Sequence, residues 1–302
     1  MQNTLLYFES MLLVLLCTTH SIFSCMTPLG YLGKQKKNGQ VSPTVQQFSS
    51  FSNLNTKTTL LSYPWSVLLI YNTEQRFHCG GTLVTHRYVL TAAHCVKTVG
   101  VRLGEHNILT DPDCEPDMAN VPYCTAPVLD VSIEKVIPHF LYSKFTYDYD
   151  IALIRLKNAI VFGRSVRPIC LPGFQSDYDR PFGTIYGWGA TENSTQSNVL
   201  IEADVPIFPL SQCQNIYRSS EIDWKHRICA AGSNDIHTCN GDSGGPLSIR
   251  LENYSRKMRY LQVGIISLGT MKCGESHNNR ALPSVFIKIS TFMDWVEQNL
   301  AM

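Results

Sequence analysis

The stretch Cys239-Asn240-Gly241-Asp242-Ser243-Gly244-Gly245-Pro246-Leu247 places a single serine among glycines and directly after an aspartate. Upstream, Thr91-Ala92-Ala93-His94-Cys95 supplies a histidine, and Asp150 heads the apolar run Asp150-Ile151-Ala152-Leu153-Ile154. A serine hydroxyl attacks carbonyl groups poorly at neutral pH unless a base takes its proton, and that base needs an acidic partner that holds its tautomer. The three segments therefore predict a nucleophile (Ser243), a general base (His94) and an orienting carboxylate (Asp150). Asp148 competes for the last role, but no apolar run follows it directly, so we expect it to be solvated.

The three residues follow one another in the order His, Asp, Ser, and on this pattern the sequence resembles the chymotrypsin-like (trypsin-type) serine proteases. The resemblance runs from about residue 63 to residue 295 and includes four more segments in family register: Tyr63-Pro64-Trp65, Cys79-Gly80-Gly81, Tyr186-Gly187-Trp188-Gly189 and Ser267-Leu268-Gly269. It implies a serine endopeptidase that hydrolyses peptide bonds of protein or peptide substrates through an acyl-enzyme on Ser243. It also implies an oxyanion hole from the backbone N–H groups of Gly241 and Ser243. Ser267 would donate a hydrogen bond to the Asp150 carboxylate and offer its backbone to an extended substrate.

Within this family, the loop cysteines and Cys170 are closest in pattern to arthropod clip-domain cascade proteases. An activating protease and a protein inhibitor are then expected partners. Only Cys17 and Cys25 precede the catalytic region, whereas the clip module has six cysteines, so we expect no clip domain. An alternative in a different class stays open: a non-catalytic homologue, locked as a zymogen, that acts as a binding cofactor in a protease cascade. The intact set of Ser, His and Asp favours the enzyme.

Short apolar runs broken by Gly, Pro and Asn follow one another after residue 62. They cover residues 66–71, 88–92, 131–137, 151–156, 183–188, 261–268 and 285–289. Such a series predicts an all-β sandwich or barrel, and the family resemblance implies two six-stranded antiparallel β-barrels with the active site in the cleft between them. The last segment predicts a C-terminal α-helix with Thr291 and Asp294 as a capping box. Its apolar face would consist of Phe292, Trp295, Val296 and Leu300.

The composition indicates a globular, secreted protein. The chain has 302 residues, is 44% hydrophobic and carries a net charge of +1, so it can bury a large core and has no electrostatic preference for nucleic acid. Eleven cysteines indicate an oxidising compartment. Sequons at Asn193 and Asn253 are consistent with secretion and glycosylation. We expect an extracellular monomer that requires no cofactor.

The amino-terminal region is similar to a secretory signal followed by a propeptide. Residues 11–17 are apolar and small or polar residues follow up to Ser24, which predicts a signal peptide over residues 1–24. No Lys or Arg precedes Lys34, and Glu9 interrupts the apolar stretch, so translation from Met11 is an alternative. The apolar run is shorter than the roughly 20 residues that a membrane-spanning helix needs. Residues 25–51 then predict a polar propeptide or linker, and residues 52–302 the peptidase domain.

Removal of such a signal takes Cys17 and leaves ten cysteines, which is enough for five disulfides. The family resemblance implies the pairs Cys79–Cys95, Cys213–Cys229 and Cys239–Cys273, the last of them across the specificity pocket. It also matches Cys170 to the position that tethers a propeptide, with Cys25 as its partner, and Cys114 with Cys124 would close a surface loop. The connectivity of these last two pairs is not fixed by sequence alone.

The primary specificity pocket departs from the tryptic pattern. His237 stands six residues before the nucleophile, where trypsin-like members of the family carry Asp, and the pocket walls are Gly269 and Ser284. Ser284 replaces the usual glycine, and Leu268 replaces the usual tryptophan. Without a carboxylate at the floor, a desolvated Lys or Arg of the substrate would have no counter-charge, so the pocket predicts a different preference. Asp235 restores a tryptic pocket only if the loop is displaced by two residues.

The activation segment departs from the family as well. The resemblance implies a new Ile-Val-Gly-Gly amino terminus whose ammonium group pairs with Asp242 and orders the oxyanion hole. Counting back from Pro64, that start falls near Ser52, where the chain reads Phe51-Ser52-Asn53-Leu54-Asn55, and no basic residue lies between residues 38 and 56. Three explanations stay open: a wrongly joined exon near residue 50, an unusual activating cut, or a homologue kept for binding.

One loop is rich in carboxylates. Glu105 matches a glutamate of the family's calcium loop, and further acidic residues follow it: Asp111, Asp113, Glu115 and Asp117. Oxygen-rich loops suit a hard cation, so structural calcium is a candidate, although acidic loops without a metal are commoner. No spacing of His and Cys indicates zinc.

Overall fold

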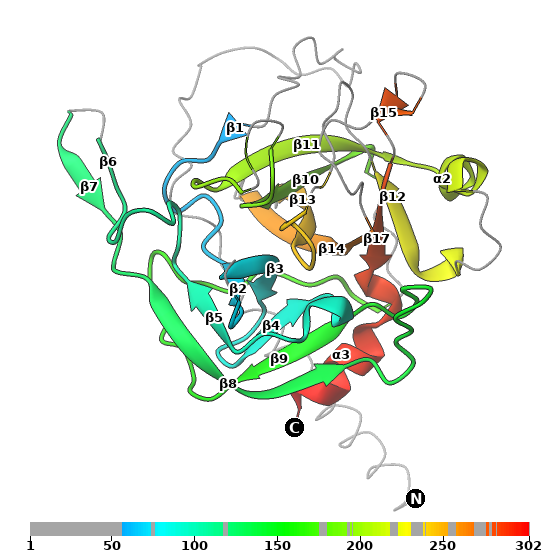
Figure 1. The fold of residues 1–302 in the computed structure, drawn as a ribbon, viewed down its shortest axis with the longest axis horizontal. Helices are drawn as coiled ribbons and strands as arrows, with labels where there is room; N and C mark the ends of the chain where they lie inside the picture. The colour runs from blue at the N-terminus through cyan, green and yellow to red at the C-terminus, as the bar shows by residue number, and fades with distance from the viewer. Residues whose placement is uncertain are drawn as a thin grey trace, which may run out of the picture.

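Two β-barrels, one from each half of the sequence, form the body of the molecule in a computed structural model of the chain (Figure 1). The structure describes residues 56–73, 76–116, 120–174, 180–191, 194, 196–217, 223–230, 238, 240–252, 258–268, 276–277, 280–281 and 283–301. The predicted signal peptide and propeptide, the glycosylation sequons at Asn193 and Asn253, and the expected activation start lie outside these residues. The predicted all-β class, with two six-stranded antiparallel barrels and a C-terminal helix, is confirmed.

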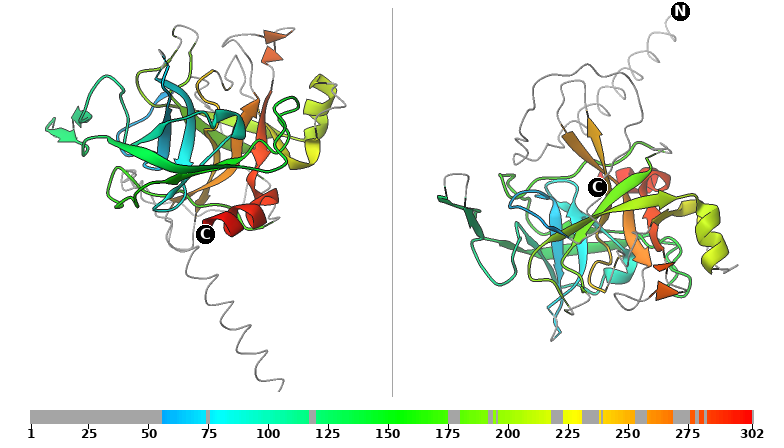
Figure 2. Two further views of the ribbon diagram at one scale, coloured as in Figure 1. Left: turned by 60° about the horizontal axis from the view of Figure 1, so that its bottom comes forward. Right: turned by 90° about the horizontal axis from the view of Figure 1, so that it is seen from above.

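The first barrel closes in the order β2-β3-β4-β9-β8-β5, and all neighbouring strands are antiparallel. Its strands are β2 (Ser66–Ile70), β3 (Phe77–Leu83), β4 (Tyr88–Thr91), β5 (Gly100–Leu103), β8 (Leu129–Pro138) and β9 (Ala152–Leu156). A hairpin of β6 (Cys114–Pro116) and β7 (Pro122–Cys124) projects from this barrel (Figure 2). Most side chains of β2, β4 and β9 are buried, because a barrel of this size is filled by its own side chains.

The second barrel closes through a pairing of β11 with β12. Its strands are β10 (Phe182–Gly187), β11 (Ile201–Phe208), β12 (Arg227–Ala230), β13 (Pro246–Glu252), β14 (Met258–Leu268) and β17 (Ser284–Lys288). The short strand β1 (Thr56–Lys57) adds to the free side of β11, and β15 (Ser276–His277) pairs with β16 (Arg280–Ala281).

Two α-helices follow strands of the second barrel, and the C-terminal one packs against His139 of the first barrel (Figure 1). The C-terminal helix α3 (Met293–Leu300) follows the 3-10 helix η3 (Ile289–Thr291). Of the predicted apolar face, Val296 and Phe292, which directly precedes the helix, are buried, while Trp295 and Leu300 are partly buried and pack against the core. The predicted capping box is wrong, because Phe292 is the N-cap and the hydroxyl of Thr291 donates to the carbonyl of Lys288 instead. Helix α2 (Leu210–Tyr217) was not predicted.

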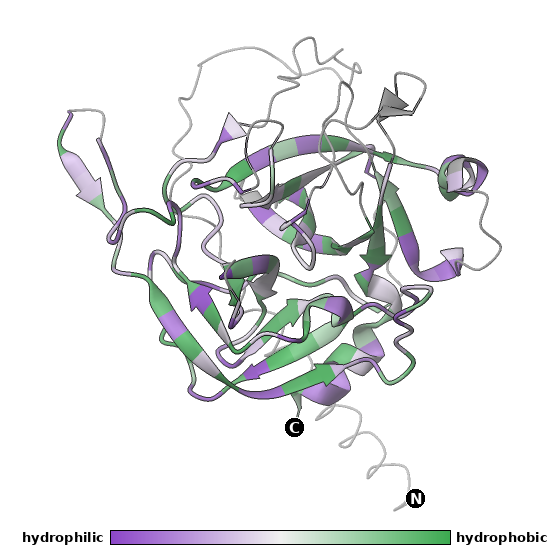
Figure 3. Ribbon diagram, in the orientation of Figure 1, coloured by the Kyte–Doolittle hydropathy of each residue, from purple (hydrophilic) through white to green (hydrophobic). Residues whose placement is uncertain are grey.

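The seam between the barrels is built from the family landmarks. Trp65 donates from Nε1 to the hydroxyl of Tyr186 at 2.6 Å, and the rings of Tyr63 and Tyr186 stack with centroids 3.8 Å apart. One hydrophobic core cluster contains residues of both barrels and of α3. Hydrophobic stretches accordingly follow strands such as β9 and β17 (Figure 3). The two barrels are therefore packed as one body.

Three predicted disulfides are present: Cys79–Cys95, Cys114–Cys124 and Cys213–Cys229. Cys170 is also disulfide-bonded, while its predicted partner Cys25 and the predicted pair Cys239–Cys273 lie outside the described residues. In the part of the chain that the structure describes, no helix combines the length and apolar character needed to cross a bilayer.

Candidate active site

His94 and Asp150 meet at the end of the first barrel. His94 lies in the 3-10 helix η1 (Ala93–Cys95) just after β4, and Asp150 lies just before β9, the antiparallel neighbour of β4. The Asp150 carboxylate is fully buried; its Oδ2 accepts a hydrogen bond from His94 Nδ1 at 2.8 Å, and its Oδ1 accepts one from the His94 backbone N–H at 2.9 Å. A neutral imidazole that donates from Nδ1 keeps its lone pair on Nε2. The imidazole is 19% exposed, so it borders solvent.

Ser267, near the end of β14, completes the shell of the carboxylate. Its hydroxyl donates to Asp150 Oδ2 at 2.6 Å, which is the bond expected from the sequence. Asp148, by contrast, is not simply solvated as predicted: its Oδ1 pairs with the buried guanidinium of Arg227 at 3.1 Å, and its Oδ2 accepts from the hydroxyl of Thr146. Asp150 is therefore the carboxylate that contacts His94, and Asp148 belongs to an ion pair beside it.

The loop of Ser243 packs against β3 and against the end of β4, which directly precedes the segment of His94. The backbone N–H of Gly80, in β3, donates to the carbonyl of Ser243 at 2.8 Å. Gly244 has φ +76°, and a Cβ there would lie 2.2 Å from Thr91 Oγ1, at the end of β4. Only glycine allows a backbone to approach this closely in this conformation. The sequence of small residues around Ser243 thus brings its loop to the end of β4, where the segment of His94 begins.

The segment just before Ser243 contains a glycine with a positive φ. Gly241 has φ +98°, a backbone conformation that residues other than glycine rarely adopt. The carboxylate of Asp242 turns toward the second barrel and accepts a hydrogen bond from the backbone N–H of Gly189 at 2.9 Å. A Cβ on Gly187 or Gly189 would lie within 2.5 Å of that carboxylate. The glycines of the Tyr186–Gly189 landmark therefore leave the space that Asp242 occupies.

Of the predicted specificity pocket, the structure describes the wall residue Ser284. Ser284, a predicted wall residue, is buried, and its Oγ accepts hydrogen bonds from the backbone N–H and the hydroxyl of Thr238 at 3.2 and 2.8 Å. It thereby anchors the residue next to the predicted floor. His237, Gly269 and Asp235 lie outside the described residues, so their roles stay predictions.

The candidate calcium ligand Glu105 is engaged by protein groups. Its Oε1 accepts from the backbone N–H of His106 at 2.9 Å, and its Oε2 pairs with Arg102 at 3.3 Å. Asp113 accepts from the backbone N–H groups of His106 and Asn107 and from a threonine hydroxyl. Burial, followed by the charge of Asp113, raises the pKa of Glu105. Because donors already occupy these oxygens and a guanidinium lies beside them, this arrangement does not fit a calcium ion, and calcium at Glu105 stays an untested prediction.

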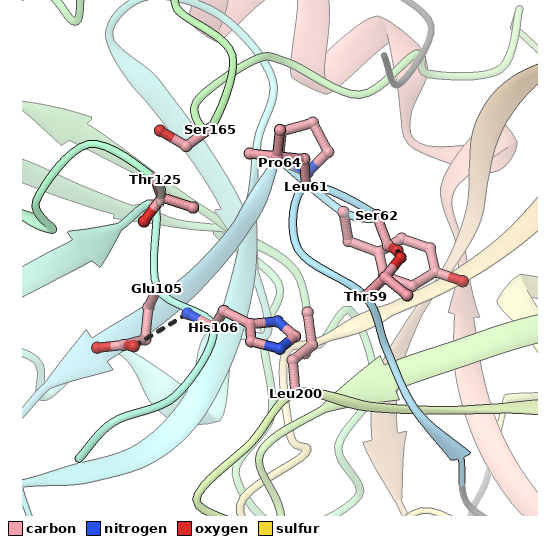
Figure 4. Close-up of a pocket in the computed structure, with 11 residues that line it drawn as sticks. Thr59, Leu61, Ser62, Pro64, Glu105, His106, Thr125, Ser165 and Leu200 are labelled. Carbon is pink, nitrogen blue, oxygen red and sulfur yellow. Dashed lines mark hydrogen bonds between the residues drawn. The ribbon is translucent and has the colours of Figure 1, made fainter. Parts of the chain in front are cut away.

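Beside Glu105 lies a small pocket between the segment before β2 and the loop after β5 (Figure 4). Its lining consists of Thr59, Leu61, Ser62, Tyr63, Pro64, Gly104, Glu105, His106, Thr125, Ser165 and Leu200. The side chains of Glu105 and His106 point to different sides of the backbone. Within the described residues, the group of potential metal ligands that lie close together is Cys79, His94 and Cys95, and its two sulfurs form a disulfide.

Sequence reasoning missed two contributors. The ring of Tyr147 meets the ring of His94 edge-on with centroids 5.5 Å apart, and Arg227 donates to Ser267 Oγ at 3.3 Å. Neither residue belongs to a motif, and each reaches the site through a contact between distant segments of the chain.

Comparisons with known proteins find relatives in both sequence and structure. A sequence profile described as Trypsin matches residues 54–296. The chain is 37% identical over 265 residues to the Spaetzle-processing enzyme of Drosophila melanogaster, covering 81% of this chain and 65% of that protein. It is 36% identical over 263 residues to serine protease ea of the same organism, covering 81% and 66%. The chain thus spans slightly less than two thirds of these relatives. The crystal structure of the Drosophila Grass clip serine protease of the Toll pathway is similar, with a TM-score of 0.71 and 33% identity over 84% of this chain and 73% of that chain.

Proposed function

The chain belongs to the trypsin family of serine proteases, and we propose that it is an active, secreted endopeptidase. The observation that carries the proposal is the buried Asp150 carboxylate, which accepts two N–H groups of His94 and the hydroxyl of Ser267. Three hydrogen bonds to one charge fix the orientation of the imidazole, and a base held in one tautomer is what a serine nucleophile requires. A fold kept only for binding has no need of this arrangement.

In the proposed reaction, Ser243 Oγ bonds to the carbonyl carbon of the substrate while His94 Nε2 takes the hydroxyl proton. The backbone N–H groups of Gly241 and Ser243 stabilise the oxyanion. Collapse of the tetrahedral intermediate breaks the peptide C–N bond, and His94 gives the proton to the leaving amine. Water then attacks the acyl-enzyme with His94 as base, which releases the acid and restores Ser243. Asp150 stays ionised throughout and stabilises the imidazolium.

The setting of the reaction is also a proposal. Disulfides persist in oxidising compartments, and the three described ones support secretion. Similarity to Drosophila proteases named for processing and melanization supports a protein substrate in a cascade, with an activating protease upstream. His237 at the predicted pocket floor supports a preference for substrate residues other than Lys or Arg.

A serine-directed fluorophosphonate tests the proposal on the secreted protein. We expect covalent labelling of the wild type, before or after treatment with candidate activating proteases, and no labelling of Ser243→Ala. Circular dichroism of both proteins serves as the folding control. Absence of labelling under every activation condition, from a folded wild-type protein, would contradict the proposal and favour the binding cofactor.

Sequencing of the mature amino terminus complements this test, because the expected Ile-Val-Gly-Gly start is missing from the sequence. A labelled protein whose new terminus lies between residues 38 and 56 supports an unusual activating cut. A labelled protein with no cut in this range instead supports activity without terminal insertion.

A further inference from the structure

Arg227 is a buried cation next to the candidate catalytic residues. It is the first residue of β12, in the second barrel, and its side chain is 1% exposed. Burial of a guanidinium is costly unless its N–H groups are satisfied. Its partners are Asp148 Oδ1 at 3.1 Å, the carbonyl of Tyr147 at 2.6 Å and Ser267 Oγ at 3.3 Å. All three flank the pair of Asp150 and His94.

The bond to Ser267 determines the direction of a hydroxyl proton. A guanidinium carries N–H donors and no acceptor, so the Ser267 oxygen must accept from Arg227. The single hydroxyl proton of Ser267 is then free to point at Asp150 Oδ2, 2.6 Å away. The result is a one-way chain in which Arg227 donates to Ser267, Ser267 to Asp150, and His94 to the same Asp150 oxygen. Hydrogen bonds in such a chain polarise one another.

The bond to the Tyr147 carbonyl holds a residue whose ring contacts the imidazole of His94. Tyr147 has φ +56°, a conformation that is strained for a residue with an aromatic side chain and persists only when its surroundings impose it. The Arg227 guanidinium donates a hydrogen bond to the Tyr147 carbonyl, and the Tyr147 ring contacts the His94 ring edge-on. One side chain of the second barrel thus fixes two neighbours of the base: Ser267, which is bonded to Asp150, and Tyr147, whose ring contacts His94.

We propose that Arg227 is a positioning residue for the reaction, which orients Ser267 toward Asp150 and holds Tyr147 against His94 by a fork of hydrogen bonds. This inference rests on the proposed peptidase function. Its charge also counts, because a cation close to the carboxylate favours the neutral imidazole over the imidazolium. The anion of Asp148 offsets part of that effect.

Other titratable groups face this network. His94 contacts Asp150 and Tyr147, and Tyr142 interacts electrostatically with Asp150 and Tyr147. On the side of Arg227 stand Asp148 and, next along the chain, His226, which faces Asp223. Burial lowers the pKa of His226, which disfavours a second cation beside Arg227.

The test uses charge variants with opposite expected signs. Arg227→Met removes a cation, so the imidazolium forms more easily and the acid limb of the kcat/KM profile moves to higher pH, by about 0.5 to 1 pH unit. Asp148→Asn removes an anion and moves the same limb to lower pH. The double variant returns the acid limb to its wild-type pH but does not restore the hydrogen bonds that Arg227 donates. We therefore expect kcat to stay about tenfold or more below wild type in both Arg227→Met proteins, with KM little changed.

Two further variants separate positioning from folding. Arg227→Lys keeps the charge and loses the fork, so its acid limb stays at the wild-type pH while kcat falls. Arg250→Met removes an arginine and its ion pair with Asp204 from β13 of the same barrel, and it should leave both quantities unchanged. An Arg227→Met protein with wild-type kcat and an unmoved acid limb would overturn the inference.

A spectroscopic readout keeps the inference distinct from the proposed function. In the Ser243→Ala background, proton NMR follows the Nδ1–H of His94 and its pH titration in a protein that cannot turn over. We expect Arg227→Met to raise the titration midpoint, Asp148→Asn to lower it, and Arg227→Lys to leave it in place. The proposed function fails if the wild type is never labelled by fluorophosphonate. The inference that Arg227 acts on the base fails if the wild type, Arg227→Met and Asp148→Asn share one midpoint, whether or not the wild type is labelled.

Discussion

The carboxylate of Asp150 accepts from both N–H groups that His94 presents to it and has no proton to give. Asp150→Asn keeps the shape and places an amide N–H₂ group where an acceptor is required, so the imidazole turns to the tautomer that lacks a lone pair at Nε2. We expect kcat to fall by about 10⁴ with little change in fold. Ester hydrolysis and circular dichroism measure the two effects. A loss smaller than about tenfold would show that Asp150 does not set the tautomer.

Gly189 allows a second prediction at this scale, because its Cβ would lie 2.4 Å from the Asp242 carboxylate. Gly189→Ala must displace that carboxylate and with it the loop that ends at Ser243. We expect kcat to fall by about 10² to 10³, the typical effect of losing one oxyanion donor. Gly163→Ala is the matched control, since no atom lies within 4 Å of its Cβ position. Equal kcat values for the two variants would contradict this role of Gly189.

At the scale of elements, the sequence predicts strands where apolar residues run together and misses those where they do not. β3 contains Gly80 and Gly81, and β11 carries Glu202, Asp204 and Pro206, so neither forms an apolar run. Their strand conformation comes from pairing with neighbours, which the local sequence does not encode. The candidate site divides in the same way. The residues in motifs were predictable from the sequence, whereas Arg227 and Tyr147 reach the site through tertiary contacts.

An aromatic cluster joins helix α3 to the loop before Asp150. The ring of His139 stacks on Tyr149 with centroids 5.0 Å apart and contacts Phe292 and Trp295, and its Nδ1 accepts the backbone N–H of Leu141 at 3.3 Å. Burial, with a smaller contribution from the charge of His226, lowers the pKa of His139. The folded protein therefore holds this ring neutral at a pH where the unfolded chain already binds a proton.

The sign of the resulting pH dependence follows from that difference. The contribution of His139 to stability is complete above the unfolded pKa of about 6.5 and is lost as the pH falls through it toward the lower folded pKa. We expect the free energy of unfolding to depend less steeply on pH between 7 and 5 in His139→Phe than in the wild type, as measured by urea unfolding. Trp295→Phe is the control, because it alters the same cluster without removing a titratable group. An unchanged slope in His139→Phe would refute the assignment.

At the scale of the whole molecule, buried contacts across the seam make the two barrels one structural unit. Thr82, in β3 of the first barrel, donates its hydroxyl to Gln262 Oε1, in β14 of the second, at 2.5 Å, and both residues are 0% exposed. The core cluster also runs without a break from Leu69 and Ile154 of the first barrel to Ile265 and Ile287 of the second. A chymotrypsin-like site needs this rigidity, because Ser243 comes from one barrel and His94 with Asp150 from the other.

Thr82→Val tests whether the two barrels unfold as one unit. The change keeps the shape of the side chain but leaves the buried Gln262 oxygen without its hydroxyl donor, which costs about 1 to 3 kcal/mol of unfolding free energy. Because the barrels share a core, we expect a single transition, shifted equally when it is followed by tryptophan fluorescence and by hydrogen exchange in β9 and β17. Thr56→Val, on the exposed strand β1, should change the free energy by less than about 0.5 kcal/mol. Separate transitions for β9 and β17, or a loss of stability confined to the first barrel, would mean that each barrel folds alone and that the seam only docks them.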